Sequence, residues 1–140
     1  MKRVLVTGAV GQIGSELTMA LREKLGGDNV VAGGRKTQPS PELRDSGPFE
    51  VVDCTDAQAL AAAVKKYEID TIYHLAAILS AIAEANPPLA WKVNIDGLYN
   101  VLEVAREQKC AVFVPSSIGA FGLSTPQDGT PQDTIQRPNT

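Results

Sequence analysis

Three glycines near the start of the chain are spaced to hold a phosphate group. Gly8, Gly11 and Gly14 follow an apolar run from Arg3 to Thr7 and open a segment whose apolar residues recur every three to four positions. Glycine allows a sharp turn at position 8, leaves room for a phosphate at position 11, and lets a helix approach the strand at position 14. Backbone amides at the helix start then face the anion, aided by the helix dipole. The spacing predicts a site for the pyrophosphate of a dinucleotide, with a purely structural glycine turn as the alternative.

The ends of the next two strand-like runs are expected to meet the adenosine half of such a ligand. An acidic residue usually stands about twenty residues after the glycine turn and binds the ribose hydroxyls. This chain has Gly33-Gly34-Arg35-Lys36 there instead. Two cations without a carboxylate leave NADP open beside NAD, although Arg35 could also stack on adenine or lie in solvent. We expect Asp53 to accept a hydrogen bond from the adenine amino group; the alternative is a solvated loop carboxylate.

The last two strand-like runs end in residues suited to the rest of the ligand and to a substrate. Leu75, Ala76 and Ala77 are small or apolar and would let the second half of the cofactor pass, with Ser80 within reach of its ring. His74 lies in an apolar strand, which favours a buried histidine with one hydrogen bond over a catalytic role. Ser116 and Ser117 would place hydroxyls where a substrate alcohol is oriented for proton removal, unless they only cap a turn.

Strand-like runs alternate with helix-like runs along the chain, which predicts an α/β fold. The strands lack strict alternation of apolar and polar residues, as expected when helices cover both faces of a parallel sheet. Right-handed crossovers then give a doubly wound, Rossmann-type sheet of order 3-2-1-4-5, which we expect to be an incomplete form of that sheet. Ligands are expected at the switch point between strands 1 and 4. The expected strands are Val4–Val6, Val30–Ala32, Glu50–Val52, Thr71–Leu75 and Ala111–Val114, and the expected helices are Gln12–Leu25, Ala57–Tyr67 and Pro88–Gln108.

Composition narrows the classes of function. The chain has 140 residues, 44% of them hydrophobic, and a net charge of -3, which fits one domain with an ordinary core. Lysine and arginine are scattered, which disfavours a nucleic-acid surface and favours a small-molecule ligand. Cys54 and Cys110 share no metal-like spacing with the single histidine, so we expect no metal site. We expect both thiols to be reduced, which fits a cytoplasmic location. The apolar runs are short, and we expect no membrane segment. We expect a dinucleotide-binding domain at 1–122 and, at 123–140, a proline-containing loop leading toward a carboxyl-terminal region.

Several of these segments together resemble the extended short-chain dehydrogenase/reductase family. The match covers essentially the whole chain, and within it the epimerase-like L-threonine 3-dehydrogenases are the most similar subgroup. The resemblance is carried by Thr7-Gly8-x-x-Gly11-x-x-Gly14, Asp53, His74-Leu75-Ala76-Ala77-Ile78-Leu79-Ser80, Asn94, Pro115-Ser116-Ser117-Ile118-Gly119-Ala120-Phe121-Gly122, Thr130-Pro131-Gln132-Asp133 and Arg137-Pro138-Asn139-Thr140.

The resemblance implies oxidation of L-threonine to 2-amino-3-oxobutanoate with hydride transfer to NAD. Ser117 would align the substrate hydroxyl, and Ser80 would contact the amino acid. Asn94 would fix a backbone kink or a proton-relay water. The glycines, Arg35, Asp53 and the segment Leu75–Ala77 are expected cofactor contacts. The resemblance adds further expected contacts, which are Gln12, Ile13, Cys54, Asn94 and Ser116.

The chain departs from this family in its general base, which is a tyrosine in Tyr-x-x-x-Lys. Tyr67, Tyr73 and Tyr99 are followed four positions later by threonine, alanine and glutamate. A phenol with an ordinary pKa of about 10 is a poor base at neutral pH without a neighbouring cation. We therefore expect the amino-terminal, cofactor-binding half of a threonine dehydrogenase that is inactive alone. A nucleotide-sugar epimerase or dehydratase fragment and a non-catalytic dinucleotide sensor are the alternatives.

The last long helix also bears on self-association. Pro88–Gln108 carries apolar residues on more than one face, including Trp91 and Tyr99. The family resemblance implies pairing through this helix, whereas a helix fully occupied by its own sheet would leave a monomer. The sequence is compatible with either a homodimer or a monomer. The last strand would form an exposed edge of the sheet.

Overall fold

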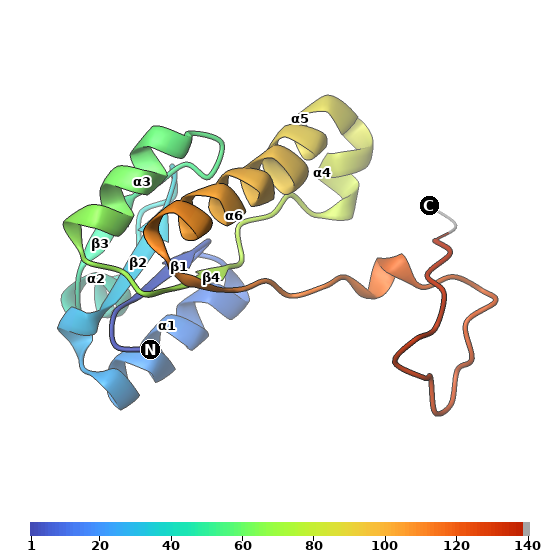
Figure 1. Cartoon of the computed structure of the whole chain (residues 1–140), viewed down its shortest axis with the longest axis horizontal. Helices are drawn as coiled ribbons and strands as arrows, with labels where there is room; N and C mark the ends of the chain where they lie inside the picture. Colours follow the sequence, from blue (N-terminus) through green and yellow to red (C-terminus); the bar gives the residue numbers. More distant parts are fainter. Residues whose placement is uncertain (139–140) are drawn as a thin grey trace.

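A five-stranded parallel sheet forms the centre of the molecule in the computed structural model, which describes residues 1–138 (Figure 1). The strand order is β3-β2-β1-β4-β5, as predicted. In register, Val4 of the first strand lies opposite Val30 on one side and Thr71 on the other. The strands are β1 (Val4–Thr7), β2 (Val30–Gly34), β3 (Phe49–Val51), β4 (Thr71–His74) and β5 (Ala111–Phe113).

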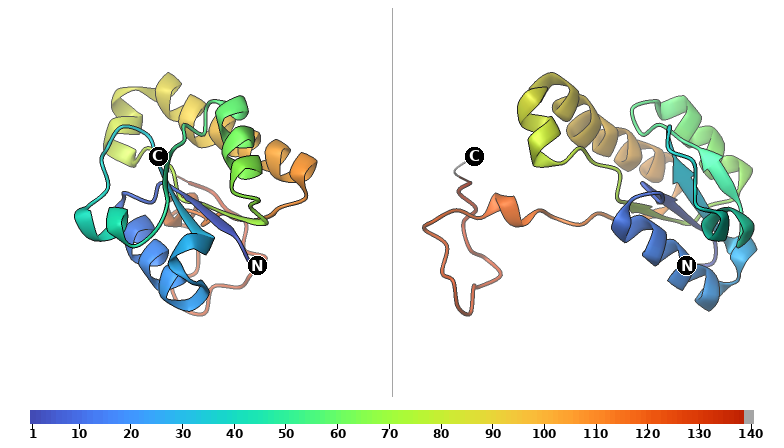
Figure 2. Two further views of the ribbon diagram at one scale, coloured as in Figure 1. Left: turned by 90° about the vertical axis from the view of Figure 1, so that its left-hand side faces the viewer. Right: turned by 180° about the vertical axis from the view of Figure 1, so that it is seen from behind.

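Helices cover both faces of this sheet (Figure 2). Val4 and Val6 point to one face and pack with Leu21 of α1 and Leu43 of α2. Leu5, between them, points to the other face, where α3 and α6 complete the larger core. The helices are α1 (Gln12–Leu25), α2 (Pro41–Asp45), α3 (Ala57–Lys66), α4 (Ser80–Ala85), α5 (Pro87–Trp91) and α6 (Gly97–Gln108), with shorter turns η1 (Gly27–Asn29), η2 (Lys92–Asp96) and η3 (Ile118–Ala120).

The predicted helix at Pro88–Gln108 is a continuous helical segment with a change of pitch inside it. α5 passes into η2, a π-helical turn, and α6 follows directly. The helix begins at Pro87, one residue before the expected Pro88, and the Asn86 side chain caps it by accepting from the Leu89 amide at 3.2 Å. Asp56 likewise caps α3, accepting from the amides of Gln58 and Ala59 at 3.0 Å.

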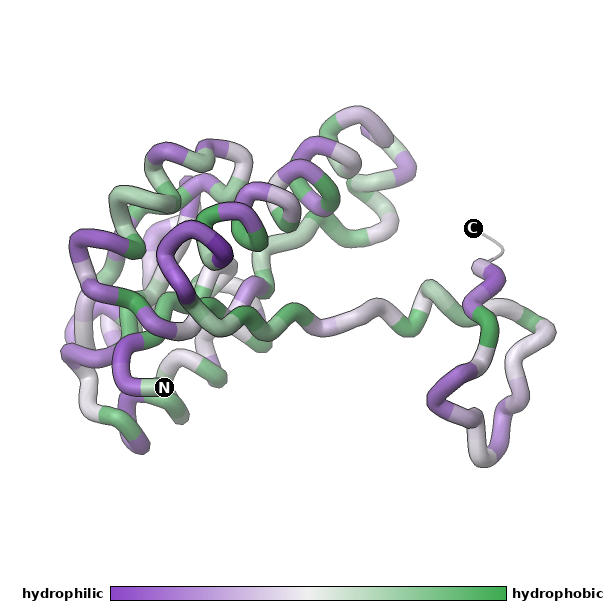
Figure 3. Tube along the Cα trace, viewed as in Figure 1, coloured by the Kyte–Doolittle hydropathy of each residue, from purple (hydrophilic) through white to green (hydrophobic). Residues whose placement is uncertain are grey.

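Beyond β5 the chain leaves the layered part of the molecule. Residues 114–138 run away from the sheet, with η3 as their one short helical turn among the described positions (Figure 1). Apolar residues in this stretch lie mainly near its start (Figure 3). The sheet and its helices thus end at Phe113, and the boundary expected at 122/123 stays a prediction. Across residues 1–138, no helix combines the length and apolar character needed to cross a membrane.

Candidate functional site

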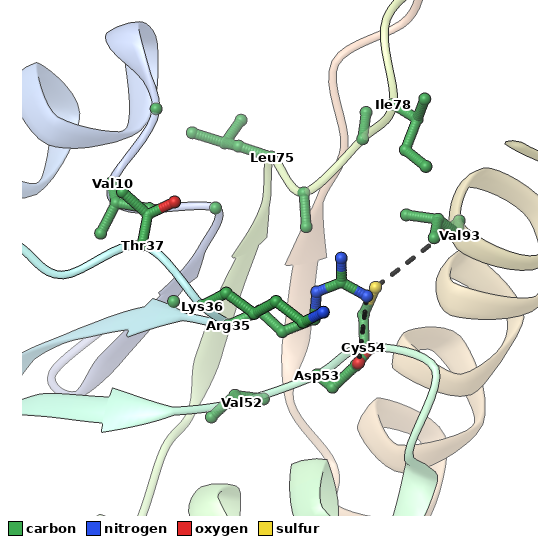
Figure 4. Close-up of a pocket in the computed structure, with 15 residues that line it drawn as sticks. Val10, Arg35, Lys36, Thr37, Val52, Asp53, Cys54, Leu75, Ile78 and Val93 are labelled. Carbon is green, nitrogen blue, oxygen red and sulfur yellow. Dashed lines mark hydrogen bonds and ion pairs between the residues drawn. The ribbon is translucent and has the colours of Figure 1, made fainter. Parts of the chain in front are cut away.

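A groove of about 310 Å³ opens at the carboxyl ends of the strands (Figure 4). The loops that follow β1, β2, β3 and β4 supply its walls, and η2 closes one side. It therefore lies at the switch point between β1 and β4, where ligands bind in open α/β sheets. The lining residues are Gly8, Val10, Gly11, Gly34, Arg35, Lys36, Thr37, Val52, Asp53, Cys54, Leu75, Ala76, Ala77, Ile78 and Val93.

The turn after β1 is possible only because glycines occupy it. Gly8 has φ +73°, and a Cβ there would lie 2.8 Å from the backbone of Leu75 and Ala76. A Cβ on Gly14 would lie 2.1 Å from the carbonyl oxygen of Gly8, so α1 packs directly on the turn. The Gly11 amide donates to the same carbonyl oxygen at 3.0 Å and closes the turn. At Gly8 and Gly11 the backbone of this loop therefore reaches the groove without a side chain of its own, while Val10 between them also lines the groove.

The amino-terminal end of α1 lies beside the groove and has the character of an anion site. Gly11 is the N-cap and has no side chain to cap the helix, and the first turn carries no acidic residue. The first amides of a helix have no acceptor within the helix, and in α1 these belong to Gln12, Ile13 and Gly14. The positive end of the helix dipole adds to them, so this end can bind a phosphate.

His74 is a buried structural residue. Its side chain is 4% exposed, and Nδ1 shares a hydrogen bond of 2.7 Å with Oγ1 of Thr7, which is 2% exposed. Burial lowers the pKa of His74, so its imidazole is neutral near pH 7. The prediction of a packed histidine with one hydrogen bond is confirmed. The pair joins the ends of β1 and β4 directly behind the glycine turn.

Arg35 and Asp53 form an ion pair across the groove, with 3.5 Å between Nη1 and Oδ2 (Figure 4). The other carboxylate oxygen of Asp53 accepts from the amide and hydroxyl of Thr55, at 2.9 and 2.8 Å. Burial acts to raise the pKa of Asp53, but the hydrogen bonds from Thr55 and the charge of Arg35 outweigh it and hold the pKa below its ordinary value. Asp53 is therefore an anionic acceptor at the groove, and Arg35 already contacts it.

Cys54 is a packing residue next to this ion pair. It is 5% exposed, and its Sγ would lie 2.7 Å from a Cβ placed on Gly97, so α6 begins in close contact with it. Burial raises the pKa of the Cys54 thiol, and the neighbouring Asp53 charge adds to this effect. The thiol therefore stays protonated at neutral pH, which does not suit a nucleophile.

Asn94 fixes the loop that forms the upper wall of the groove. Its Oδ1 accepts from the Ile78 amide at 2.8 Å, and its Nδ2 donates to the Ile78 carbonyl at 3.0 Å. Asn94 belongs to η2, and π-helical turns occur frequently at functional sites. The paired hydrogen bonds connect η2 to the segment that follows β4.

The structure brings many of the expected site residues into one groove. Outside it lie the start of α1, Asn94 and the three serines. Gln12 and the 72% exposed Ile13 occupy the outer surface of α1. Ser80 is the first residue of α4, and Ser116 and Ser117 are exposed beyond β5, where the Ser117 hydroxyl accepts from the Gly119 amide at 3.1 Å. The expected residues that line the groove are Gly8, Gly11, Arg35, Asp53, Cys54, Leu75, Ala76 and Ala77.

Other lining residues were not expected as contacts, although each adjoins one that was. Thr37 follows the pair of cations, Val52 precedes Asp53, Ile78 follows Ala77, and Val93 precedes Asn94. Val10 lies inside the glycine turn. Each of these residues could have been predicted from its place next to an expected contact in the sequence, because neighbouring residues of one loop lie at the same edge of the sheet.

A parallel sheet of this order, with a glycine turn and an uncapped helix start at its switch point, defines a dinucleotide-binding domain of the Rossmann type. The sequence matches the NAD dependent epimerase/dehydratase family over residues 4–140. The chain belongs to this family, which confirms the extended short-chain dehydrogenase/reductase resemblance.

Individual relatives agree with this assignment. An uncharacterized epimerase/dehydratase of Staphylococcus haemolyticus is 51% identical over the whole chain, which covers 44% of that protein. The structure of L-threonine dehydrogenase from Clostridium difficile is 52% identical with a TM-score of 0.93, over 99% of this chain and 44% of that one. A UDP-glucose 4-epimerase from Thermus thermophilus, solved in complex with NAD, is 28% identical with a TM-score of 0.82, over 97% of this chain and 44% of that one. The chain thus spans less than half the length of each protein it matches.

Proposed function

We propose that the groove binds NAD and that the chain serves the oxidation of L-threonine to 2-amino-3-oxobutanoate. The feature that carries the proposal is the glycine turn from Gly8 to Gly14 beside an uncapped helix start. Support for the substrate is the similarity to the Clostridium difficile L-threonine dehydrogenase. NAD would supply the hydride acceptor, and the chain's own residues would hold and orient it.

The residues at the groove fit a dinucleotide part by part. The amides at the start of α1 are free of a side-chain cap and would bind the diphosphate. Asp53 is anionic and would accept from the adenine amino group. The small segment Leu75–Ala77 would let the nicotinamide half pass along the loop that Asn94 fixes.

The residues proposed to act on L-threonine are Ser117, which would align its hydroxyl, and Ser80, which would contact the amino acid. Both are exposed, with Ser80 at the start of α4 and Ser117 beyond β5. None of the three tyrosines stands in a Tyr-x-x-x-Lys sequence. We therefore expect the 140-residue chain to bind NAD without turning over L-threonine.

Calorimetric titration with NAD tests the cofactor proposal. Gly11→Val places a branched side chain at the phosphate position, and we expect it to weaken NAD binding by about tenfold or more. Ser15→Val adds a side chain of the same kind one turn further along α1 and should leave the affinity unchanged. Absence of NAD binding by the folded wild-type chain would overturn the proposal.

A chimera tests the substrate. The chain is joined to the part of the Clostridium difficile L-threonine dehydrogenase that it does not cover, and NADH formation is followed by absorbance. We expect activity with L-threonine, and a fall in kcat of about a hundredfold or more for Ser117→Ala. A folded, NAD-binding chimera that is inactive with L-threonine, or a Ser117→Ala chimera of full activity, would contradict the assignment.

A further inference from the structure

At the end of β2, neighbouring side chains would have to shift to admit the carboxylate that would bind ribose hydroxyls. Gly34 occupies this position, and a Cβ added there would lie 2.9 Å from Cζ of Phe49 and 3.2 Å from Cγ1 of Val10. Both neighbours are partly buried in the core on that face of the sheet. The groove wall at the adenosine end is therefore formed by backbone and apolar atoms instead of an acidic side chain.

The residues directly after Gly34 make this end of the groove positive. Arg35 and Lys36 both line it, and Thr37 adds a hydroxyl (Figure 4). Asp53 is the one carboxylate among the described lining residues, so two cations face a single anion. A phosphate monoester carries a charge of about -1.5 to -2 at pH 7 and would balance this excess.

Arg35 is free to change its partner. Its contact with Asp53 is 3.5 Å long, and the two side chains are 48% and 32% exposed. Asp53 keeps two other hydrogen bonds, both from Thr55, if Arg35 leaves. An exposed ion pair of this kind contributes little, whereas the planar guanidinium binds a phosphate through two parallel hydrogen bonds.

We propose that Arg35 and Lys36 form a site for the 2′-phosphate of NADP, so that the chain binds NADP at least as tightly as NAD. On binding, Arg35 exchanges the Asp53 carboxylate for the phosphate, and Lys36 supplies the second positive charge. Asp53 remains anchored by Thr55 and available to the adenine. This inference rests on the proposed function, because it requires a dinucleotide in the groove.

Parallel calorimetric titrations with NAD and NADP test the site on the intact chain. Adenosine 2′,5′-bisphosphate and 5′-AMP are titrated as fragments that differ only in the 2′-phosphate. We expect NADP to bind with a Kd equal to or below that of NAD, and the bisphosphate to bind more tightly than 5′-AMP. Arg35→Ala and Lys36→Ala should each weaken NADP binding by about tenfold more than they weaken NAD binding.

Lys65→Ala is the matched control, because it removes one positive charge from an exposed position on α3, outside the groove. It should leave both affinities unchanged. NAD binding that is tighter than NADP binding would overturn the phosphate site and leave the proposed function intact. Failure of both dinucleotides to bind the folded chain would overturn the proposed function itself. Equal losses of NAD and NADP affinity in Arg35→Ala would also contradict the site.

Discussion

The side-chain amide of Asn94 forms two hydrogen bonds with the backbone of Ile78, one as acceptor at 2.8 Å and one as donor at 3.0 Å. Ile78 lines the groove, and Asn94 lies in the π-helical turn between α5 and α6. The upper wall of the groove is thus held by one side chain from a distant part of the sequence.

Asn94→Ala should loosen this wall. Loss of both hydrogen bonds leaves the Ile78 amide and carbonyl without their partner, at a cost of about 1–3 kcal/mol in the free energy of unfolding. We also expect NAD affinity to fall severalfold, measured by calorimetry. Gln108→Ala removes a comparable hydrogen bond, from Nε2 to the Ala61 carbonyl at 3.1 Å, and should lower stability without changing NAD affinity. Equal NAD affinity in wild type and Asn94→Ala would contradict the role of Asn94.

Gly14→Ala should be strongly destabilising. The new Cβ would lie 2.1 Å from the Gly8 carbonyl oxygen, so α1 must move away from the turn. We expect a loss of about 3 kcal/mol or more in urea denaturation. Ser15→Ala, the next position on α1, should change stability by less than about 1 kcal/mol. A Gly14→Ala chain as stable as wild type would disprove the close contact.

Arg22 is a buried arginine that binds only uncharged acceptors, and its loss should be costly. It is 4% exposed and donates to the carbonyl oxygens of Val30, Leu43 and Pro48 and to the Ser46 hydroxyl. Arg22→Ala removes every one of these donors, so we expect a loss of about 3 kcal/mol or more by urea denaturation.

Arg44→Ala is the control for Arg22, because Arg44 is exposed and pairs with its neighbour Asp45. We expect it to change stability by less than about 1 kcal/mol. If Arg22→Ala were as mild as Arg44→Ala, the buried hydrogen bonds would not be stabilising the packing of α1 on β2, α2 and the segment that follows α2.

Stability should fall as pH drops through the range in which histidine titrates. Burial lowers the pKa of His74 in the folded chain below the ordinary 6.5, so the unfolded chain binds the proton first. The neutral imidazole stabilises the fold above pH 6.5, and this contribution is lost as pH falls, by up to about 1.4 kcal/mol per pH unit. Urea denaturation between pH 7.5 and 5.5 measures it.

His74→Asn provides the comparison. Asparagine can keep a hydrogen bond to Thr7 but does not titrate, and His74 is the chain's single histidine. We expect the pH dependence between 7.5 and 5.5 to flatten in this variant. An unchanged slope would show that another group causes it.

Much of the fold was predictable because burial and periodicity determine it. Strands such as Val4–Thr7 are buried on both faces and read as continuous apolar runs, which led to the correct strand order. α2 and α4 were not predicted, because five or six residues are too few to show a helical period. The π-helical turn was also missed, since its hydrogen bonds leave no distinct apolar pattern.

The site was predictable where backbone geometry requires a residue type. Gly8 and Gly14 are required by a positive φ and a close contact, and both constraints follow from the motif. The pairing of Arg35 with Asp53 was not predictable, because it depends on which way two side chains turn across a groove. Ser116 and Ser117 were expected beside the nicotinamide, whereas here they lie exposed beyond β5, and their contacts with cofactor and substrate stay a prediction.

Backbone amide shifts in nuclear magnetic resonance test most directly whether the turn after β1 binds a diphosphate. The ¹⁵N-labelled chain is titrated with NAD, and each amide is followed. We predict that the largest shifts occur at Gln12, Ile13 and Gly14, with Gly129 in the distant loop unchanged. NAD binding that leaves these three amides unshifted, or no binding to the folded chain, would contradict the account.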